Sequence, residues 1–465
     1  MKKPLSLFLP ILLIAFFFSC NKTTKKDYKA EAANPDLLHE CTDQLNDVII
    51  FDVFKPPVAT RIFVYANLAA YETLRHDYPA YGTLASKINA FEAVPAPDKD
   101  LEYCLPLASL KAYAHVGRAL TFSAEMWDNF EKDFFKKFKE MGVPDDVYKR
   151  SLEYGDKVAK HVLDYSSTDG YKTTRGSRHT LGEIAGSWVP TPPNYAEACE
   201  PKWNNIRTFT LDSCTQFSAP DPAPFDLSPN SEFYKLTKEV YDYGQNLTDE
   251  QREIAYFWDD NPMVTNIKGH IAFAEKKMSP TCHWIAITKT ISKEKKQEVM
   301  KALETYTLTS IALNDAFIGC WDSKFKTDRI RPVSVINQIF DNKWLPFLET
   351  PPFPEYTSGH SSISAAAGII LTHVFGDNVA FIDSTEYKYG HGVRKFESFK
   401  QAYWEVSMSR VYGGIHYRDG VEQGTYQGEK IGEWVWKTLK DPLSSPQNIV
   451  EAETEATPTL KSSTN

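Results

Sequence analysis

The chain has 465 residues, of which 42% are hydrophobic and 24% are charged. Such a chain can build a large apolar core, which excludes an intrinsically disordered protein. There are 22 glycines and 28 prolines and no fixed-period repeat, which excludes a collagen-like fibre and a repeat array. The formal net charge of -9 offers no general basic surface, so we expect no nucleic-acid partner.

The first twenty residues have the pattern of an export signal. Two lysines precede an apolar run over 5–18, which is too short for a comfortable membrane span. Ser19-Cys20 resembles the end of a bacterial lipoprotein signal, in which the cysteine becomes lipidated. We therefore expect an exported protein. It is either anchored to a membrane through a lipidated Cys20, in the periplasm, at the outer membrane or at the cell surface, or it is secreted.

Composition and periodicity divide the rest of the chain into five parts. They are a polar tether over 21–35, an N-terminal helical region over 36–172, a proline-rich ordered loop over 173–230, a helical bundle over 231–440 and a disordered tail over 441–465. Strand alternation is nearly absent, while helical periodicity covers, for example, 62–74, 107–141 and 147–165. The predicted fold class is all-α, made of helical bundles.

Six cysteines remain after the signal, and none lies in a CxxC or another metal-ligand spacing. The cysteines therefore do not imply zinc. Disulfides are compatible with an exported protein, and Cys199 and Cys214 are the nearest pair, but the sequence does not fix the connectivity.

Three segments of the second helical block carry chemistry, and the first is a helix expected over 293–324. Apolar residues at helical spacing, such as Phe317, place Lys324 on the apolar face. A buried lysine requires an anionic partner or a lowered pKa. Arg331-Pro332 follows, where the proline stops the helical path. The alternative is that Lys324 reaches solvent from the helix end.

In the second segment, Ser358, Gly359 and His360 stand where a helix of small residues begins, and Gly376 ends it. The N–H groups at the helix start, the open backbone at Gly359 and the Ser358 hydroxyl suit an oxyanion. The alternative is that Ser358 is only an N-cap and His360 a surface residue.

In the third segment, helical spacing places Arg410 on the same face as Tyr403, so it points inward. A pair of glycines then breaks the helix and is followed by His416, just before a new helix that Asp419 is expected to cap. The alternative for His416 is a core histidine with ordinary hydrogen bonds.

Taken together, the three segments are similar to the signature shared by vanadium-dependent haloperoxidases and type 2 phosphatidic acid phosphatases. The matching residues are Lys324, then Arg331-Pro332, then Ser358-Gly359-His360, then Ser409-Arg410 and His416. The resemblance covers about 300–420, and upstream the motifs PTPP and His283-Trp284 look like bacterial haloperoxidases. Thr357 replaces the family's usual proline. Asp419 follows His416 by three residues rather than four, so its role in orienting the histidine is in doubt.

The resemblance implies vanadate as the cofactor and assigns roles to the matching residues. Lys324, Arg331 and Arg410 would neutralise the anion's oxygens, and Ser358 and Gly359 would add neutral donors. His416 would bind the metal through Nε2, and His360 would act as the acid–base group. The implied catalytic residues are His360, His416 and Lys324.

Two aromatic residues bear on the substrate. Trp321 and Phe353 match positions that line the vanadate pocket in haloperoxidases, and they predict an apolar halide pocket with little room for a lipid or sugar phosphate. The pattern resembles the bacterial iodoperoxidases most, so we expect hydrogen peroxide and a halide, iodide, as substrates. Two alternatives stay open: an acid phosphatase of the same superfamily, and a glycan-binding outer-membrane lipoprotein that is not an enzyme.

Overall fold

The structure is a computed structural model that describes residues 27–268, 271–390 and 392–440. The predicted export signal with Cys20, the first part of the predicted tether and the predicted tail lie outside the described residues. Among the helices of these described ranges, none combines the length and the apolar character needed to cross a membrane.

Helices dominate the described chain, and this confirms the predicted all-α fold class. The α-helices are α1 (Tyr28–Ala32), α2 (Pro35–Phe51), α3 (Pro56–Leu74), α4 (Leu105–Leu120), α5 (Ala124–Phe134), α6 (Lys136–Glu140), α7 (Asp145–Ser166), α8 (Tyr171–Thr174), α9 (Glu232–Asn246), α10 (Asp249–Phe257), α11 (Pro280–Glu294), α12 (Val299–Thr327), α13 (Pro332–Ile339), α14 (Gly359–Phe375), α15 (Phe399–Tyr412) and α16 (Arg418–Lys440). Short 3-10 helices are η1 (Arg75–Asp77), η2 (Trp203–Asn205) and η3 (Tyr387–Tyr389). Two antiparallel hairpins pair β1 (Met263–Lys268) with β2 (Ile271–Lys276) and β3 (Phe381–Asp383) with β4 (Arg394–Phe396).

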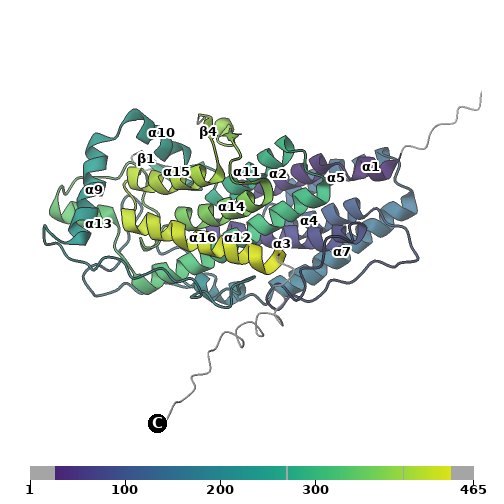
Figure 1. The fold of residues 1–465 in the computed structure, drawn as a ribbon, viewed down its shortest axis with the longest axis horizontal. Helices are drawn as coiled ribbons and strands as arrows, with labels where there is room; N and C mark the ends of the chain where they lie inside the picture. The colour runs from purple at the N-terminus through teal and green to yellow at the C-terminus, as the bar shows by residue number, and fades with distance from the viewer. Residues whose placement is uncertain (1–26, 269–270, 391, 441–465) are drawn as a thin grey trace, which may run out of the picture.

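The long helices form two groups along the long axis of the molecule (Figure 1). In the N-terminal group α4 packs against α3 and α7, and in the C-terminal group α14 packs against α12, α15 and α16. The helix α12 contacts both α3 and α14. One apolar core therefore runs through both groups, and α12 lies at its centre.

Glycines on α16 allow this helix to lie very close to α14. A Cβ atom at Gly428 would lie 2.0 Å from the Ser362 carbonyl oxygen, and one at Gly424 would lie 2.8 Å from the Ser358 carbonyl oxygen. Only glycine permits such an approach. The close contact fixes the start of α14, where the predicted oxyanion residues lie.

The proline-rich segment over 173–230 is ordered in the structure. Its Trp188 and Trp203 are each 1% exposed, and its backbone is tied to α12 because the Asp315 carboxylate accepts a hydrogen bond from the Phe209 N–H at 2.8 Å. The segment therefore packs on the helices instead of acting as a free linker.

Two predicted helices differ from the observed ones. The periodic stretch over 107–141 is three helices. The first break, between α4 and α5, occurs where the Asp52 carboxylate accepts hydrogen bonds from the N–H groups of Phe122 and Ser123 and holds a turn. The helix predicted from residue 293 begins at Val299, because the chain turns at Lys296, whose φ is +51°. The apolar pattern continues across both turns, so periodicity alone did not reveal them.

Two further features concern the predicted tether and the cysteines. The second half of the predicted tether is helical: α1 lies inside it, and its Tyr28 hydroxyl donates to Glu102 at 2.7 Å. The six cysteines of the described residues are all free, so Cys199 and Cys214 do not form a disulfide.

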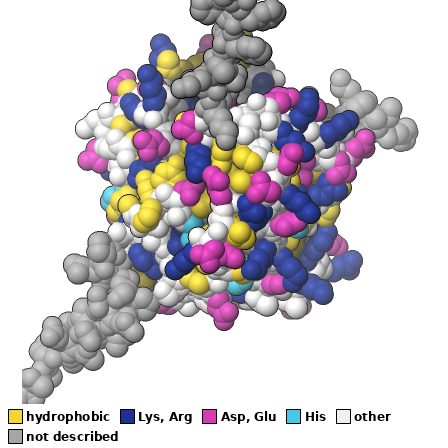
Figure 2. All heavy atoms as spheres, turned by 90° about the vertical axis from the view of Figure 1, so that its right-hand side faces the viewer, with side chains coloured by type: hydrophobic (Ala, Val, Ile, Leu, Met, Phe, Trp, Pro, Cys, Tyr) yellow, Lys and Arg dark blue, Asp and Glu magenta, His cyan; other side chains and the backbone are white. Residues whose placement is uncertain are grey.

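The end of the molecule formed by the N-terminal helices carries both signs of charge. Figure 2 shows lysine and arginine side chains interspersed with aspartate and glutamate over this face. The N-terminal helices also carry ion pairs, such as that of Lys137 in α6 with Glu40 in α2 at 2.5 Å. The lysine that the sequence singles out, Lys324, is instead buried in the last turn of α12.

Candidate active site

Helix ends that are distant in the sequence bring the predicted site residues together. Lys324 lies in the last turn of α12, Arg331 at the N-cap of α13, Ser358 at the N-cap of α14, Arg410 in the last turn of α15, and His416 between α15 and α16. Each of these side chains is at most 2% exposed. A lysine and two arginines are thus buried in one region of the protein.

Lys324 is fully buried and does not reach solvent from the helix end. Its Nζ donates hydrogen bonds of 3.0 Å to the carbonyl oxygens of Pro354 and Glu355. Nζ also lies 4.9 Å from the centre of the Phe353 ring. Burial lowers the pKa of Lys324 to about 7, since no water solvates the ammonium group.

Arg331 contacts His416 directly. Its Nη1 lies 3.1 Å from the His416 Nε2 and donates to the Ile415 carbonyl at 2.7 Å, while its Nε donates to the Phe353 carbonyl at 2.8 Å. Its Nη2 is buried and has no hydrogen-bond partner among the described residues. Burial lowers the pKa of this guanidinium to about 10.

Arg410 is held by backbone oxygens of a single turn. Its Nη2 donates to the Trp258 carbonyl, its Nη1 donates to the Asp259 carbonyl at 3.3 Å, and its Nε donates to the Ser409 hydroxyl at 2.9 Å. Burial lowers the pKa of Arg410 to about 10.

The three cations share an unusual feature: within the described part of the chain, all their hydrogen bonds go to neutral groups, and none forms an ion pair with a carboxylate. Buried charges without a counter-ion are costly. The free Nη2 of Arg331 adds a donor that the protein leaves unused. These residues therefore fit a multiply charged oxyanion such as vanadate or phosphate.

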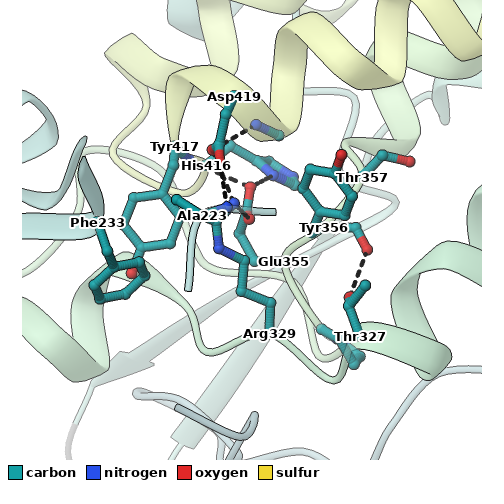
Figure 3. A network of polar contacts seen from close by, with 12 residues as sticks. Ala223, Phe233, Thr327, Arg329, Glu355, Tyr356, Thr357, His416, Tyr417 and Asp419 are labelled. Atoms are coloured by element: carbon teal, nitrogen blue, oxygen red, sulfur yellow. Dashed lines mark hydrogen bonds and ion pairs between the residues drawn. The ribbon is translucent and has the colours of Figure 1, made fainter. Parts of the chain in front are cut away.

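A buried carboxylate orients His416. Figure 3 shows Glu355 between His416 and Arg329: its Oε1 lies 2.7 Å from the His416 Nδ1, and its Oε2 accepts from Arg329 at 3.1 Å. The carboxylate requires a proton on Nδ1, so the Nε2 lone pair of the neutral ring faces Arg331. Burial, with Arg331 and Lys324 nearby, lowers the pKa of His416 well below its usual value. The ring is set to ligate a metal through Nε2.

Sequence reasoning missed Glu355. Its signal was a single acidic residue in the motif FPEYTSGH, three residues before Ser358. The predicted N-cap role of Asp419 is wrong, because this residue lies in the first turn of α16. Its carboxylate accepts from Arg329 at 2.8 Å, so it acts on Glu355 through that arginine and does not touch His416.

The start of α14 is built as a neutral donor site. The Ser358 hydroxyl oxygen accepts hydrogen bonds from the Ser361 N–H at 3.3 Å and from the Ser361 hydroxyl at 2.8 Å, which leaves its own hydrogen free to donate. The residue is therefore an N-cap and a candidate donor at once. At Gly359 a Cβ atom would lie 3.3 Å from the Trp321 ring, so glycine allows that ring to approach the helix start.

His360 is half-buried, and its Nε2 is a buried atom without a hydrogen-bond partner among the described residues. Burial, followed by the charges of Arg410, His416 and Lys324, lowers the pKa of His360 well below its usual value. The ring is neutral at neutral pH and has a nitrogen available for proton transfer.

A cavity of about 240 Å³ leads to this region and is lined by His360, Arg410 and Phe353, among others. Trp321 does not line it: this residue is 1% exposed, and its ring packs behind Phe353 with 5.0 Å between ring centres. Of the two residues predicted to form a halide pocket, the structure thus places one at the cavity wall and the other in the layer behind it.

Comparisons with known proteins agree with this geometry. A family model described as the VCPO second helical-bundle domain matches residues 304–445. A solved bacterial vanadium-dependent iodoperoxidase is 41% identical, with a TM-score of 0.81 over 87% of this chain and 96% of its own. A bacterial vanadium-dependent chloroperoxidase shares the fold in its holo form, with 15% identity, a TM-score of 0.63 and coverage of 84% of this chain and 93% of its own. No curated protein sequence matches the chain.

Proposed function

The chain belongs to the vanadium-dependent haloperoxidases, whose cofactor is vanadate, and from this we propose that it oxidises iodide with hydrogen peroxide. The observation that carries the proposal is the setting of His416. Its Nε2 lies 3.1 Å from Arg331, one of the three buried cations without carboxylate partners, and its Nδ1 is held by Glu355 at 2.7 Å. Such a site binds an oxyanion through charge and fixes it through one histidine nitrogen.

The site residues would contact vanadate in different ways. Lys324, Arg331 and Arg410 would neutralise its oxygens, Ser358 would donate a hydrogen bond, and His416 would ligate the metal. When bound, vanadate acts as a Lewis acid toward peroxide without a change of its oxidation state. The burial of the three cations strengthens their interaction with an anion, because water does not screen them.

His360 is the proposed acid–base group. It lines the cavity by which small molecules reach the site, and its Nε2 has no other partner in the described residues. Because the ring is neutral, it can take a proton from hydrogen peroxide and later return one to a product oxygen. Burial, followed by the charge of Arg410, keeps the pKa of His360 low.

Iodide is the proposed halide for two reasons. Phe353 provides an apolar cavity wall, which suits a large, weakly hydrated halide. The relative that is 41% identical is described as an iodoperoxidase. Phe353 also spans two of the cations, since its ring centre lies 4.9 Å from the Lys324 Nζ and 5.0 Å from the Arg331 Cζ.

Steady-state rates test this proposal. Protein reconstituted with orthovanadate is assayed with peroxide and iodide, bromide or chloride at equal vanadium content, and the vanadium-free protein is assayed with a phosphate monoester. We expect the fastest turnover with iodide and negligible ester hydrolysis. Faster turnover with chloride would contradict iodide as the substrate, and efficient hydrolysis without halide oxidation would favour a phosphatase.

A further inference from the structure

A second polar cluster lies beside the proposed active site, and none of its side chains belongs to the proposed anion-binding residues. Asp260, His283 and Glu386 are buried, and one potential ligand atom from each lies within 4.8 Å of the other two. They come from the turn after α10, from α11 and from the segment after β3. Their exposed fractions are 5%, 0% and 3%, respectively, so these groups are largely removed from bulk water.

The hydrogen bonds of His283 define which nitrogen faces the cluster. Its Nε2 lies 2.9 Å from the Asp383 carboxylate, and its Nδ1 lies 3.0 Å from Asp260. Asp383 is itself held by the Thr385 hydroxyl at 2.7 Å and the Thr385 N–H at 3.0 Å. An Nε2–H donated to Asp383 leaves the Nδ1 lone pair pointing at carboxylate oxygens, where only a proton or a cation makes the contact favourable.

Glu386 indicates that a cation, rather than a proton, lies between His283 and the carboxylates. Its Oε1 is buried, belongs to a side chain that is 97% buried, and has no hydrogen-bond partner among the described residues. A proton on His283 would satisfy Asp260 and Asp383 but would leave this oxygen without a partner. A cation between the three side chains would satisfy all of them. The nearby Lys277 does not fill this role, because its Nζ pairs with Asp259 at 3.2 Å.

We propose that Asp260, His283 and Glu386 bind a divalent transition-metal cation of the Zn²⁺ type, with Asp383 holding the His283 ring in the ligating tautomer. Two carboxylates and one imidazole are a ligand set that Zn²⁺ accepts, with a carboxylate on the far nitrogen of the histidine. Asp260 also lines the 240 Å³ cavity, which provides a path for the ion.

The proposed cation site is linked to the anion-binding residue Arg410 through one turn of the chain. The carbonyl oxygens of Trp258 and Asp259, next to Asp260, are the acceptors that hold the Arg410 guanidinium. The Trp258 ring stacks on His283 with 4.6 Å between ring centres. Asp260 itself has a φ of +43°, a conformation that a ligated side chain would hold in place. The cation is thus a positioning element for Arg410.

Zinc content measured by mass spectrometry tests the proposal. The full-length protein is incubated with Zn²⁺, desalted and compared with Glu386→Gln, which has nearly the same shape but is a poor ligand, and with Asp383→Asn. The control is Glu433→Gln, an exposed glutamate that accepts from His373 at 2.8 Å. We expect about one Zn²⁺ per chain in wild type and control, and none retained by Glu386→Gln. Asp383→Asn should retain less zinc than wild type, because its affinity for zinc should be about 10- to 100-fold lower.

Wild-type protein that retains no Zn²⁺ would overturn the proposal, and so would folded Glu386→Gln with the zinc content of wild type. If the variants do not fold, zinc-edge X-ray absorption on wild type decides. One imidazole among nitrogen and oxygen ligands at about 2.0 Å is expected. A shell with sulfur ligands would place the zinc on cysteines and contradict the assignment.

Discussion

His416 and Glu355 form a buried pair in which the Nδ1 of the histidine lies 2.7 Å from Oε1 of the glutamate. The other carboxylate oxygen accepts from Arg329, so the glutamate cannot rotate away without losing that ion pair. The pair keeps one tautomer of the histidine, and it increases the electron density available at Nε2 for a metal bond. Metal affinity should therefore depend on a residue that does not touch the anion.

We expect Glu355→Gln to weaken vanadate binding by about 10- to 100-fold, the usual effect of losing a carboxylate behind a ligating histidine. The amide oxygen can still accept from Nδ1, but the negative charge that favours metal ligation is gone. Equilibrium dialysis with orthovanadate measures the change. Asp419→Asn is the matched control, since Asp419 contacts Arg329 and not the histidine, and its effect should be much smaller. An equal loss of vanadate affinity in both variants would contradict a specific role of Glu355 behind His416. It would mean that the ion-pair network only stabilises the fold around the site.

Substitutions of the two histidines should affect vanadate retention and turnover differently. His416→Ala removes the proposed ligand and should abolish retention of vanadate after desalting. His360→Ala should keep part of the vanadate through the three cations but lower turnover by about 10²- to 10⁴-fold, as expected for the loss of one acid–base group. Vanadium content and iodide oxidation are measured on the same samples. Equal vanadium content and equal activity in the two variants would mean that the roles are wrongly assigned.

Vanadate affinity should depend on pH through Lys324. Burial lowers the pKa of its amine to about 7 in the free protein, and a bound anion favours the charged form and raises it. Below about pH 7 the amine is already charged, whereas above it binding must take up a proton, so affinity should fall by up to about tenfold per pH unit. Dissociation constants are compared with those of Lys324→Gln, which shares the titration of vanadate itself. Identical pH profiles would refute the assignment.

Phe353→His should change halide preference more than vanadate affinity. Phe353 lines the cavity, and its ring faces Lys324 and Arg331. Its carbonyl oxygen accepts from the Arg331 Nε at 2.8 Å, and a substitution of the side chain keeps this backbone contact. A histidine there adds a polar, titratable donor beside the anion site. Rates with iodide and bromide at matched vanadium occupancy give the ratio. An unchanged ratio would assign Phe353 to core packing.

The positions of the inward cations could be predicted from the sequence because helical spacing fixes which residues share a face. Lys324 and Arg410 each lie on the apolar side of a helix and are at most 1% exposed. The breaks at Phe122 and Lys296 could not be predicted in this way. They depend on a distant carboxylate, Asp52, and on a local backbone conformation, neither of which alters the apolar pattern.

The residues that support the site were harder to predict for the same reason. Glu355 is one acidic residue in a loop, and only the fold brings it to His416, which follows it by 61 positions. The carbonyl oxygens that hold Arg410 belong to Trp258 and Asp259, far upstream, and backbone groups leave no trace in a sequence. The role of Asp419 in orienting the histidine was in doubt from its spacing alone, and in the structure Arg329 holds its carboxylate.

The most direct test of the account is a titration of vanadium-free protein with orthovanadate while iodide oxidation by hydrogen peroxide is recorded. We predict no activity at the start, a rise proportional to bound vanadium, and a plateau at one vanadium per chain. The same titration of His416→Ala should stay at the baseline. Iodide oxidation that does not require vanadate, or that reaches its full rate in His416→Ala, would contradict the central claim.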